Sequence, residues 1–453
     1  MIAPAPRARK SLLVLAAVLA GLLPALDAAA QAPAKHRTVL ILPFQTIDVT
    51  RDERWFGEGV AESVTLALIH VPGLIQVDRQ RLVRVPQPES WDDAGALAAG
   101  RALRADIVVY GEVKRTAAEL TLAPKVLEIR GERADRTALD VAVIPEGAFF
   151  ERVREVPVAV VRAVKAPLSE ADANRLRKAA SPTTSLRAYE AFVRGQVAGG
   201  RPGKEAQEAA VEHLARAVEL DPQFVAAQYA LGAAHHALGN RWKAAAQFRA
   251  ASQLDPTYAE PLKALGDIFI SGPRRLFAEA VEAYTKAIDL RPFFADAHVG
   301  LGDARAAKGE IDAAIASYQK ALSHNPLNPR VHASLGRIYF AEKSLYFEAV
   351  NAYKKAIDLD PADVDARMGL AEVYEDKGLY TEAVAEYKTV VTQDPKHTGA
   401  LYNLALVYEK VDPKESIALW ERYISLAGPQ PSEKDWVDVA KLHLRKLRNQ
   451  FPQ

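Results

Sequence analysis

The sequence predicts an α/β domain with a mixed sheet, followed by an all-α solenoid of about seven helix pairs and a C-terminal capping helix. Two observations lead to this prediction. The second part of the chain repeats one pattern of about 34 residues, a period typical of stacked helix pairs. The first part contains short apolar runs bounded by Gly, Pro and Asp, which indicate buried strands.

Composition narrows the possible functions. The chain has 453 residues, of which 49% are apolar and 25% charged, as in an ordinary globular protein. Its 58 basic and 57 acidic residues balance, so net charge provides no general attraction to nucleic acid or to an anionic membrane. There is no cysteine, which excludes disulfides, thiolate metal sites, thiol catalysis and a lipidated N-terminal cysteine.

Residues 1–30 have the composition of a secretory signal. Arg7, Arg9 and Lys10 precede an apolar stretch over residues 11–23, and alanines at 28–30 offer a cleavage site. The apolar stretch is about 13 residues long, whereas a membrane-spanning helix needs about 20. We therefore expect cleavage and a periplasmic or otherwise exported protein without a stable membrane span. A retained anchor is the alternative.

Residues 36–168 are expected to form the α/β domain, and residues 169–184 a linker. Strands are predicted over residues 38–44, 73–78, 106–113, 119–129 and 137–144, and helices over residues 55–70, 94–105 and 149–164. The order β-α-β-α-β-β-β-α implies a mixed sheet with helices packed on it.

Several motifs of this domain occur in a familiar order, including Ile-Leu-Pro-Phe at 41–44 and Trp-Phe-Gly-Glu-Gly at 55–59. The domain resembles the N-terminal domain of the Tol-system periplasmic propeller protein and the curli-secretion-type envelope domain. The resemblance implies an envelope docking or regulatory domain. A channel role is not implied, because the chain lacks the lipidated cysteine of curli-type proteins. We interpret Gly57, Gly59, Gly73 and Gly111 as turn residues.

Residues 185–429 contain the repeats. Each unit ends at a proline, at Pro222, Pro256, Pro292, Pro326, Pro361 and Pro395. One unit carries Leu231, Gly232, Ala244 and Phe248 at positions that recur in its neighbours. Small residues let two helices approach closely, and proline ends the second helix because it lacks an amide donor. The repeat is similar to the tetratricopeptide (TPR) family, which implies binding of other proteins.

Residues 430–453 are expected to form the capping helix. Five apolar side chains are predicted to cover the last repeat: Trp436, Val439, Leu442, Leu444 and Leu447. No sequence pattern of a catalytic, metal or cofactor site stands out. The segment 200–205 lacks the spacing of a phosphate loop, and the adjacent His235 and His236 point apart on a helix. We expect no enzymatic activity and no cofactor.

The resemblance to TPR proteins implies that the first helix of each pair lines a concave face. The polar and aromatic residues placed there by register are Tyr229, Glu260, Lys263, Asp267, Asp296, Asp303, Arg330, Arg337, Phe340, Asp365, Met368, Glu372, Glu375, Tyr402 and Glu409. Eight are acidic and three basic. This predicts a groove for a protein or peptide partner with basic residues, the alternative being an ordinary solvated face.

These features predict an exported, non-enzymatic scaffold or adaptor, with envelope assembly or transport as its candidate setting. The alternative is a sensory or regulatory subunit whose N-terminal α/β domain binds a small ligand.

Overall fold

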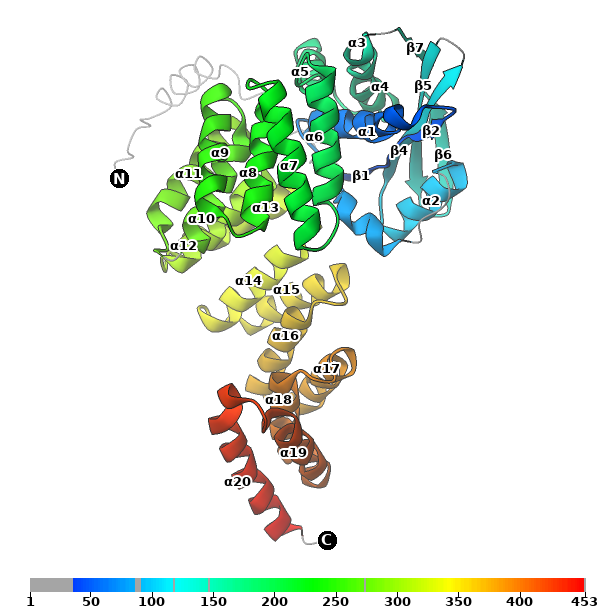
Figure 1. Ribbon diagram of the computed structural model, residues 1–453. Helices are drawn as coiled ribbons and strands as arrows, with labels where there is room; N and C mark the ends of the chain where they lie inside the picture. The colour runs from blue at the N-terminus through cyan, green and yellow to red at the C-terminus, as the bar shows by residue number, and fades with distance from the viewer. Residues whose placement is uncertain (1–35, 86–90, 117–118, 146, 273, 452–453) are drawn as a thin grey trace, which may run out of the picture.

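The computed structural model describes residues 36–85, 91–116, 119–145, 147–272 and 274–451. The predicted secretory signal at 1–30 lies outside these residues. An α/β domain lies beside the first helices of a long helical array, and the array continues away from it to the C-terminus (Figure 1). Among the described residues, no helix combines the length and apolar character needed to cross a membrane.

The described part of the N-terminal domain contains a mixed seven-stranded sheet. Its strands are β1 Arg37–Ile41, β2 Gln45–Ile47, β3 Leu74–Gln76, β4 Ile107–Thr116, β5 Glu119–Arg130, β6 Arg133–Ala138 and β7 Ala142–Ile144. The order is β3-β1-β4-β5-β6, with β2 paired to β4 and β7 to β5. β1 is parallel to β3 and β4, whereas β5 is antiparallel to β4 and β6. The predicted mixed sheet is confirmed, but the strand expected at 137–144 is split between β6 and β7.

Helices pack on both faces of this sheet. They are α1 Trp55–Leu68, α2 Asp93–Ala102, α3 Phe149–Val153 and α4 Glu155–Ala163, with 3-10 turns η1 Arg51–Glu53 and η2 Arg79–Arg84. Side chains of a strand alternate between faces. Val39 and Ile41 of β1 therefore join the core with α1 and α4, whereas Leu40 and Leu42 join the core with α2.

Three of the four glycines expected in turns lie instead inside regular elements, so the interpretation was wrong for these three. Gly57 and Gly59 are in α1 and Gly111 is in β4. A Cβ atom at Gly57 would lie 2.0 Å from the carbonyl oxygen of Phe44, so only glycine lets α1 pack this closely on the segment after β1. Gly73, by contrast, has a φ of 81° in the turn before β3.

The predicted linker is largely helical. α5 Glu170–Ala180 begins with a capping box, in which the Ser169 hydroxyl accepts from the Asp172 amide and the Asp172 carboxylate accepts from the Ser169 amide. Leu176 and Ala180 are buried, and α5 packs on α1. Residues 170–180 therefore extend the packed structure toward the array and are not an extended connection.

The described part of the array contains seven antiparallel helix pairs, which confirms the predicted fold class. The pairs are α6 Leu186–Gly199 with α7 Lys204–Leu220, α8 Val225–Ala237 with α9 Arg241–Leu254, α10 Ala259–Ser271 with α11 Phe277–Leu290, α12 Ala295–Ala307 with α13 Ile311–His324, α14 Pro329–Ala341 with α15 Tyr346–Leu359, α16 Val364–Asp376 with α17 Tyr380–Gln393, and α18 Thr398–Val411 with α19 Pro413–Ala427.

Tyrosines of the second helices join neighbouring pairs. The buried ring of Tyr284 lies between Gly266 of its own pair and Gly300 of the next pair. Added Cβ atoms at these glycines would come within 2.7 and 2.3 Å of the ring. The small residues of the repeat thus make room for an aromatic side chain, as the sequence predicts.

The chain ends with η3 Pro431–Glu433 and α20 Lys434–Gln450, which packs on α19. Leu444 and Leu447 are buried as predicted, together with Val437 and Ala440. Trp436 is 56% exposed, but its ring contacts Tyr402 of the last repeat, with the ring centroids 5.4 Å apart. The predicted contacts of Val439 and Leu442 are wrong, because these side chains lie on the opposite face of α20 and remain 38% and 61% exposed.

Candidate functional site

The α/β domain and the first repeats share one apolar core. This core runs from Val60 and Val64 of α1 to Phe192 of α6 and Leu231 of α8. Tyr189 of α6 is fully buried within it, and its hydroxyl donates to the Gly59 carbonyl oxygen at 2.7 Å. Burial of an aromatic side chain of this size contributes about 2–3 kcal/mol. The domain is therefore anchored to the array, and is not a loosely tethered unit.

The domain also reaches later repeats along one edge of the array. His36 Nε2 lies 2.9 Å from the carbonyl oxygen of Ser323, at the end of α13. The guanidinium of Arg104 donates to the carbonyl oxygen of Asp358 in α15 at 3.4 Å. The contacts of the domain thus extend from α6 to α15.

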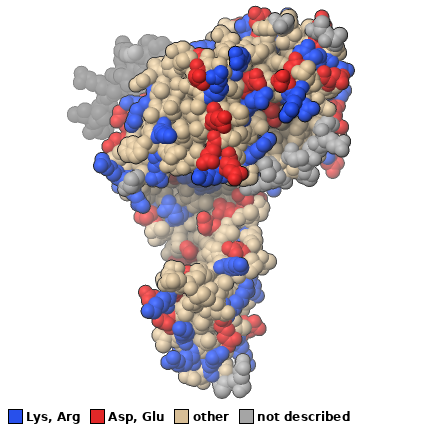
Figure 2. Space-filling model, viewed as in Figure 1, with Lys and Arg blue, Asp and Glu red and all other residues tan. Residues whose placement is uncertain are grey.

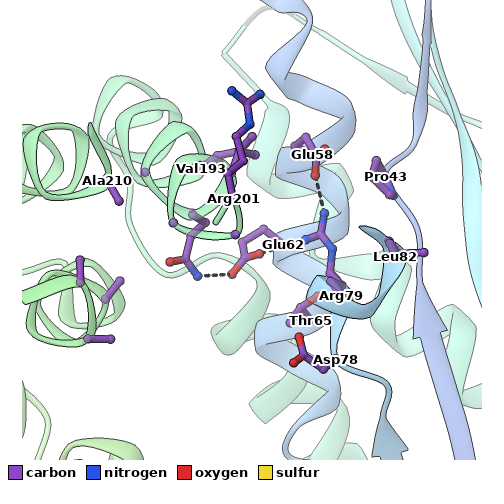
Figure 3. Close-up of a pocket in the computed structure, with 18 of the residues that line it drawn as sticks. Pro43, Glu58, Glu62, Thr65, Asp78, Arg79, Leu82, Val193, Arg201 and Ala210 are labelled. Atoms are coloured by element: carbon purple, nitrogen blue, oxygen red, sulfur yellow. Dashed lines mark hydrogen bonds and ion pairs between the residues drawn. The ribbon is translucent and has the colours of Figure 1, made fainter. Parts of the chain in front are cut away.

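A cavity of about 700 Å³ lies between the domain and the first repeats (Figure 3). The two walls differ in chemistry. The domain contributes Glu58 and Glu62 of α1 with Asp78 and Arg79 after β3, whereas α8 contributes only alanines. Arg201, from the turn between α6 and α7, lies across the cavity from α1 (Figure 3). The site combines an apolar wall with a charged one, as ligand-binding cavities commonly do.

The carboxylates of this cavity are held in place by neighbours. Arg79 forms ion pairs with Glu58 and, at 3.2 Å, with Glu62 Oε2. The amide of Gln196 in α6 donates to Glu62 Oε1 at 3.1 Å. Burial raises the pKa of Glu62, and the Arg79 charge opposes this rise.

The first predicted groove residues, Tyr229 and Glu260, make contacts within the fold. The ring of Tyr229 packs against Phe248 and Tyr258. Glu260 is 8% exposed and accepts a hydrogen bond from Arg291 at 2.6 Å. It lines a second cavity that α1 and α5 close from the domain side. Glu260 is therefore not open to a partner.

Four of the predicted acids accept hydrogen bonds from buried aromatic side chains. Asp267 accepts from Tyr284 at 2.7 Å, Asp303 from Tyr318 at 2.6 Å, Glu375 from Tyr387 at 3.0 Å and Glu409 from Trp420 at 2.8 Å. Lys263 and Arg330 in turn pair with Asp267 and Asp303. These acids accept hydrogen bonds from buried donor groups of the repeats, a role that was not predicted from the sequence.

The remaining predicted residues differ in their exposure. Asp296, Arg337, Asp365 and Glu372 are exposed, and Phe340, Met368 and Tyr402 are half-buried. Desolvation, and then the neighbouring Glu375 carboxylate, raise the pKa of Glu372. Desolvation also raises the pKa of Glu375. On the face visible in Figure 2, acidic and basic side chains are interspersed over the C-terminal helices.

Comparison with known proteins identifies the repeats. Residues 204–239 and 302–343 match the model of the family described as TPR repeat, and residues 346–398 match that of the tetratricopeptide repeat. These segments are tetratricopeptide repeats. Proteins with such repeats are generally protein-interaction scaffolds. The matched models lie within residues 204–398, so the resemblance of the N-terminal domain to Tol and curli-type envelope domains stays a prediction.

Individual relatives match part of this chain. The small glutamine-rich tetratricopeptide repeat-containing protein 2 of Mycosarcoma maydis is 33% identical over 120 residues, covering 26% of this chain and 33% of that protein. The chain therefore matches about one third of that relative's length.

Similar solved structures include YrrB, a TPR protein with an unusual peptide-binding site, at 24% identity and a TM-score of 0.37 over 44% of this chain and 97% of that one. MamA is 28% identical with a TM-score of 0.33, over 37% of this chain and 95% of that one.

Proposed function

We propose that the protein is an exported, non-enzymatic adaptor that binds a protein or peptide partner in the C-terminal part of its concave face. We call this part the C-terminal groove and define it by Arg337, Phe340, Asp365, Met368, Glu372, Glu375 and Tyr402. The supporting observation is the division of the concave side by the α/β domain. Glu260 lies in a cavity that the domain closes on one side, whereas Asp365 and Glu372 remain exposed.

The chemistry of the C-terminal groove favours a partner with basic and apolar side chains. Met368 and Tyr402 occupy the same position in successive repeats and offer apolar anchors. The groove has three acidic residues, namely Asp365, Glu372 and Glu375, and one basic residue, Arg337. A Lys or Arg side chain placed beside Glu372 and Glu375 would stabilise their charged forms, which now repel each other.

A charge reversal tests this proposal. We expect Glu372→Lys to weaken partner binding about tenfold or more, or about 1.4 kcal/mol, because it replaces an attractive charge with a repulsive one. The partner is first captured by cross-linking in envelope fractions, and its affinity for the purified full chain is then measured at low and high salt. Glu382→Lys, at an exposed position of α17, is the matched control and should leave affinity unchanged.

The pH dependence of binding has a definite direction. Because the pKa values of Glu372 and Glu375 are raised, these side chains lose their charge at a higher pH than ordinary carboxylates. As the pH falls, affinity should therefore begin to drop at a higher pH than it would for carboxylates with ordinary pKa values. Binding that is indifferent both to salt and to Glu372→Lys would contradict the electrostatic part of the proposal.

A regulatory subunit is the second candidate function, favoured by the 700 Å³ cavity between the domain and α6 to α8. A small molecule bound there would contact both parts of the protein and raise the unfolding temperature by mass action. Thermal-shift measurements with mixtures of metabolites test this function. A shift that Arg201→Ala abolishes would support it, and no shift with any mixture would oppose it. Neither result bears on the C-terminal groove.

A further inference from the structure

The cavity between the domain and the first repeats is lined by polar side chains whose donor groups are already engaged. Four neutral side chains of the lining carry a hydroxyl or an amide: Thr65, Gln76, Gln196 and Gln207. Gln76 Nε2 donates to the Thr65 carbonyl oxygen at 2.8 Å, and the Thr65 hydroxyl donates to the Ala61 carbonyl oxygen. Gln207 Nε2 donates to the Gly199 carbonyl oxygen at 2.8 Å. The Gln196 amide nitrogen points at Glu62.

This arrangement leaves hydrogen-bond acceptors for the cavity. A carboxamide that turns its nitrogen toward one partner turns its oxygen, with two lone pairs, away from that partner. In the described part of the chain, no hydrogen bond reaches the side-chain oxygens of these three glutamines. The four side chains are only half-buried, so their oxygens are available to a ligand. The lining therefore fits a molecule that brings N–H donors.

The charged side chains of the lining differ between the two walls. The domain contributes the carboxylates of Glu58, Glu62 and Asp78, and Arg79 pairs with both glutamates. Across the cavity, Arg201 is exposed and takes part in none of the ion pairs of the described residues. Three carboxylates against two arginines leave one excess negative charge. A ligand that fits both walls carries a cationic group for the domain and an anionic group for Arg201.

Helix α8 supplies a third wall, with room for an aliphatic chain. Its lining residues are Ala230, Ala233, Ala234 and Ala237, whose spacing places them on one face of the helix. At 1.5 Å per residue, this row is about 10 Å long. Methyl groups are small, so an unbranched chain of methylene groups can lie along them and gain apolar contact.

We propose that this cavity binds a basic amino acid of the lysine, ornithine or arginine type. Its carboxylate pairs with Arg201, and its α-ammonium donates to the oxygen of Gln207, which is held at Gly199 in the same turn. Its methylene chain lies along α8, and its cationic end reaches Glu58 and the oxygen of Gln76. The single net positive charge of such a ligand balances the negative excess of the lining. The proposal rests on the regulatory function proposed above for this cavity, and it names the class of the ligand.

Calorimetric titration of the purified full chain with L-lysine, L-ornithine and L-arginine tests the ligand class. Two analogues of lysine that lack one group each are the matched controls. L-Norleucine lacks the side-chain ammonium, and 1,5-diaminopentane lacks the carboxylate. Each should bind about tenfold more weakly than lysine, or less, because a charged hydrogen-bonding group is lost. No binding of any of the three amino acids up to about 10 mM, or norleucine binding as tightly as lysine, would overturn the proposal.

Variants of the chain test where the amino acid binds. Arg201→Ala and Glu58→Gln should each weaken lysine binding about tenfold, whereas Arg201→Ala should leave the binding of 1,5-diaminopentane unchanged. Arg216→Ala is the control, since Arg216 is exposed on α7 and lies outside the cavity lining. Circular dichroism confirms that each variant is folded. Lysine binding that survives both Arg201→Ala and Glu58→Gln would reject this site.

The same experiments separate the ligand class from the function on which it rests. A metabolite of another class could give a thermal shift that Arg201→Ala abolishes while the basic amino acids give none. The cavity would then remain a regulatory site, and the assignment of a basic amino acid would be wrong. If neither the basic amino acids nor any other metabolite gives a shift, both the ligand class and the regulatory function fail.

Discussion

Tyr284 illustrates how one residue joins two repeats. Its hydroxyl donates to Asp267 of its own helix pair, and its ring fills the space left by Gly266 and Gly300. Burial raises the pKa of this hydroxyl, so it stays a hydrogen-bond donor throughout the physiological pH range. A side chain in this position thus connects three helices through packing and one hydrogen bond.

The close packing of Tyr284 predicts what happens when one methyl group is added to a glycine beside its ring. In Gly300→Ala, the new methyl group would lie 2.3 Å from the Tyr284 ring, so the ring and its hydrogen bond to Asp267 must shift. We expect a loss of about 1–3 kcal/mol in the free energy of unfolding, measured by chemical denaturation. In Gly199→Ala the nearest side-chain atom is 3.5 Å away, so stability should be equal or slightly higher. Equal losses in the two variants would contradict the packing described for Tyr284.

Sequence periodicity could identify Tyr284 and Gly266, because an aromatic residue and a glycine recur at these places in several repeats. It could not show what the acids of the concave face do. Glu409 and its donor Trp420 are 11 residues apart on different helices, and Asp267 and Tyr284 are 17 apart. Such pairs depend on how two helices are rotated against each other. The acids predicted from the repeat register therefore include exposed Glu372 together with carboxylates that already accept hydrogen bonds within the fold.

Elements differ in how completely their sequence specifies them. The paired helices were predictable, because apolar spacing, small residues and a terminal proline agree in each repeat. α5 was missed, although Ser169 and Asp172 form a capping-box pattern, because proline on either side suggested a break in structure. α20 was predicted as a helix, and Leu444 and Leu447 are buried as expected, whereas Val439 and Leu442 are exposed. Its apolar residues lie on two faces, and the sequence pattern does not reveal which of them packs on α19.

The position of the α/β domain against the array is a property of the whole molecule. No local sequence pattern predicts it. Tyr189 bonds to Gly59 across 130 residues, and His36 lies against Ser323 across 287. These contacts follow from two surfaces that become adjacent only after both parts fold. They divide the predicted groove into a part packed beneath the domain and the C-terminal groove, and they create the cavity between Glu62 and α8.

Site-specific photo-crosslinking tests the central claim most directly. A photoreactive residue replaces Met368 or Tyr402 in the C-terminal groove, or Trp242 on the outer side of α9, and crosslinked proteins from envelope fractions are identified by mass spectrometry. We predict that the same partner is captured from Met368 and from Tyr402, and that Trp242 captures none. Capture of that partner from Trp242, with none from the two groove positions, would contradict the account.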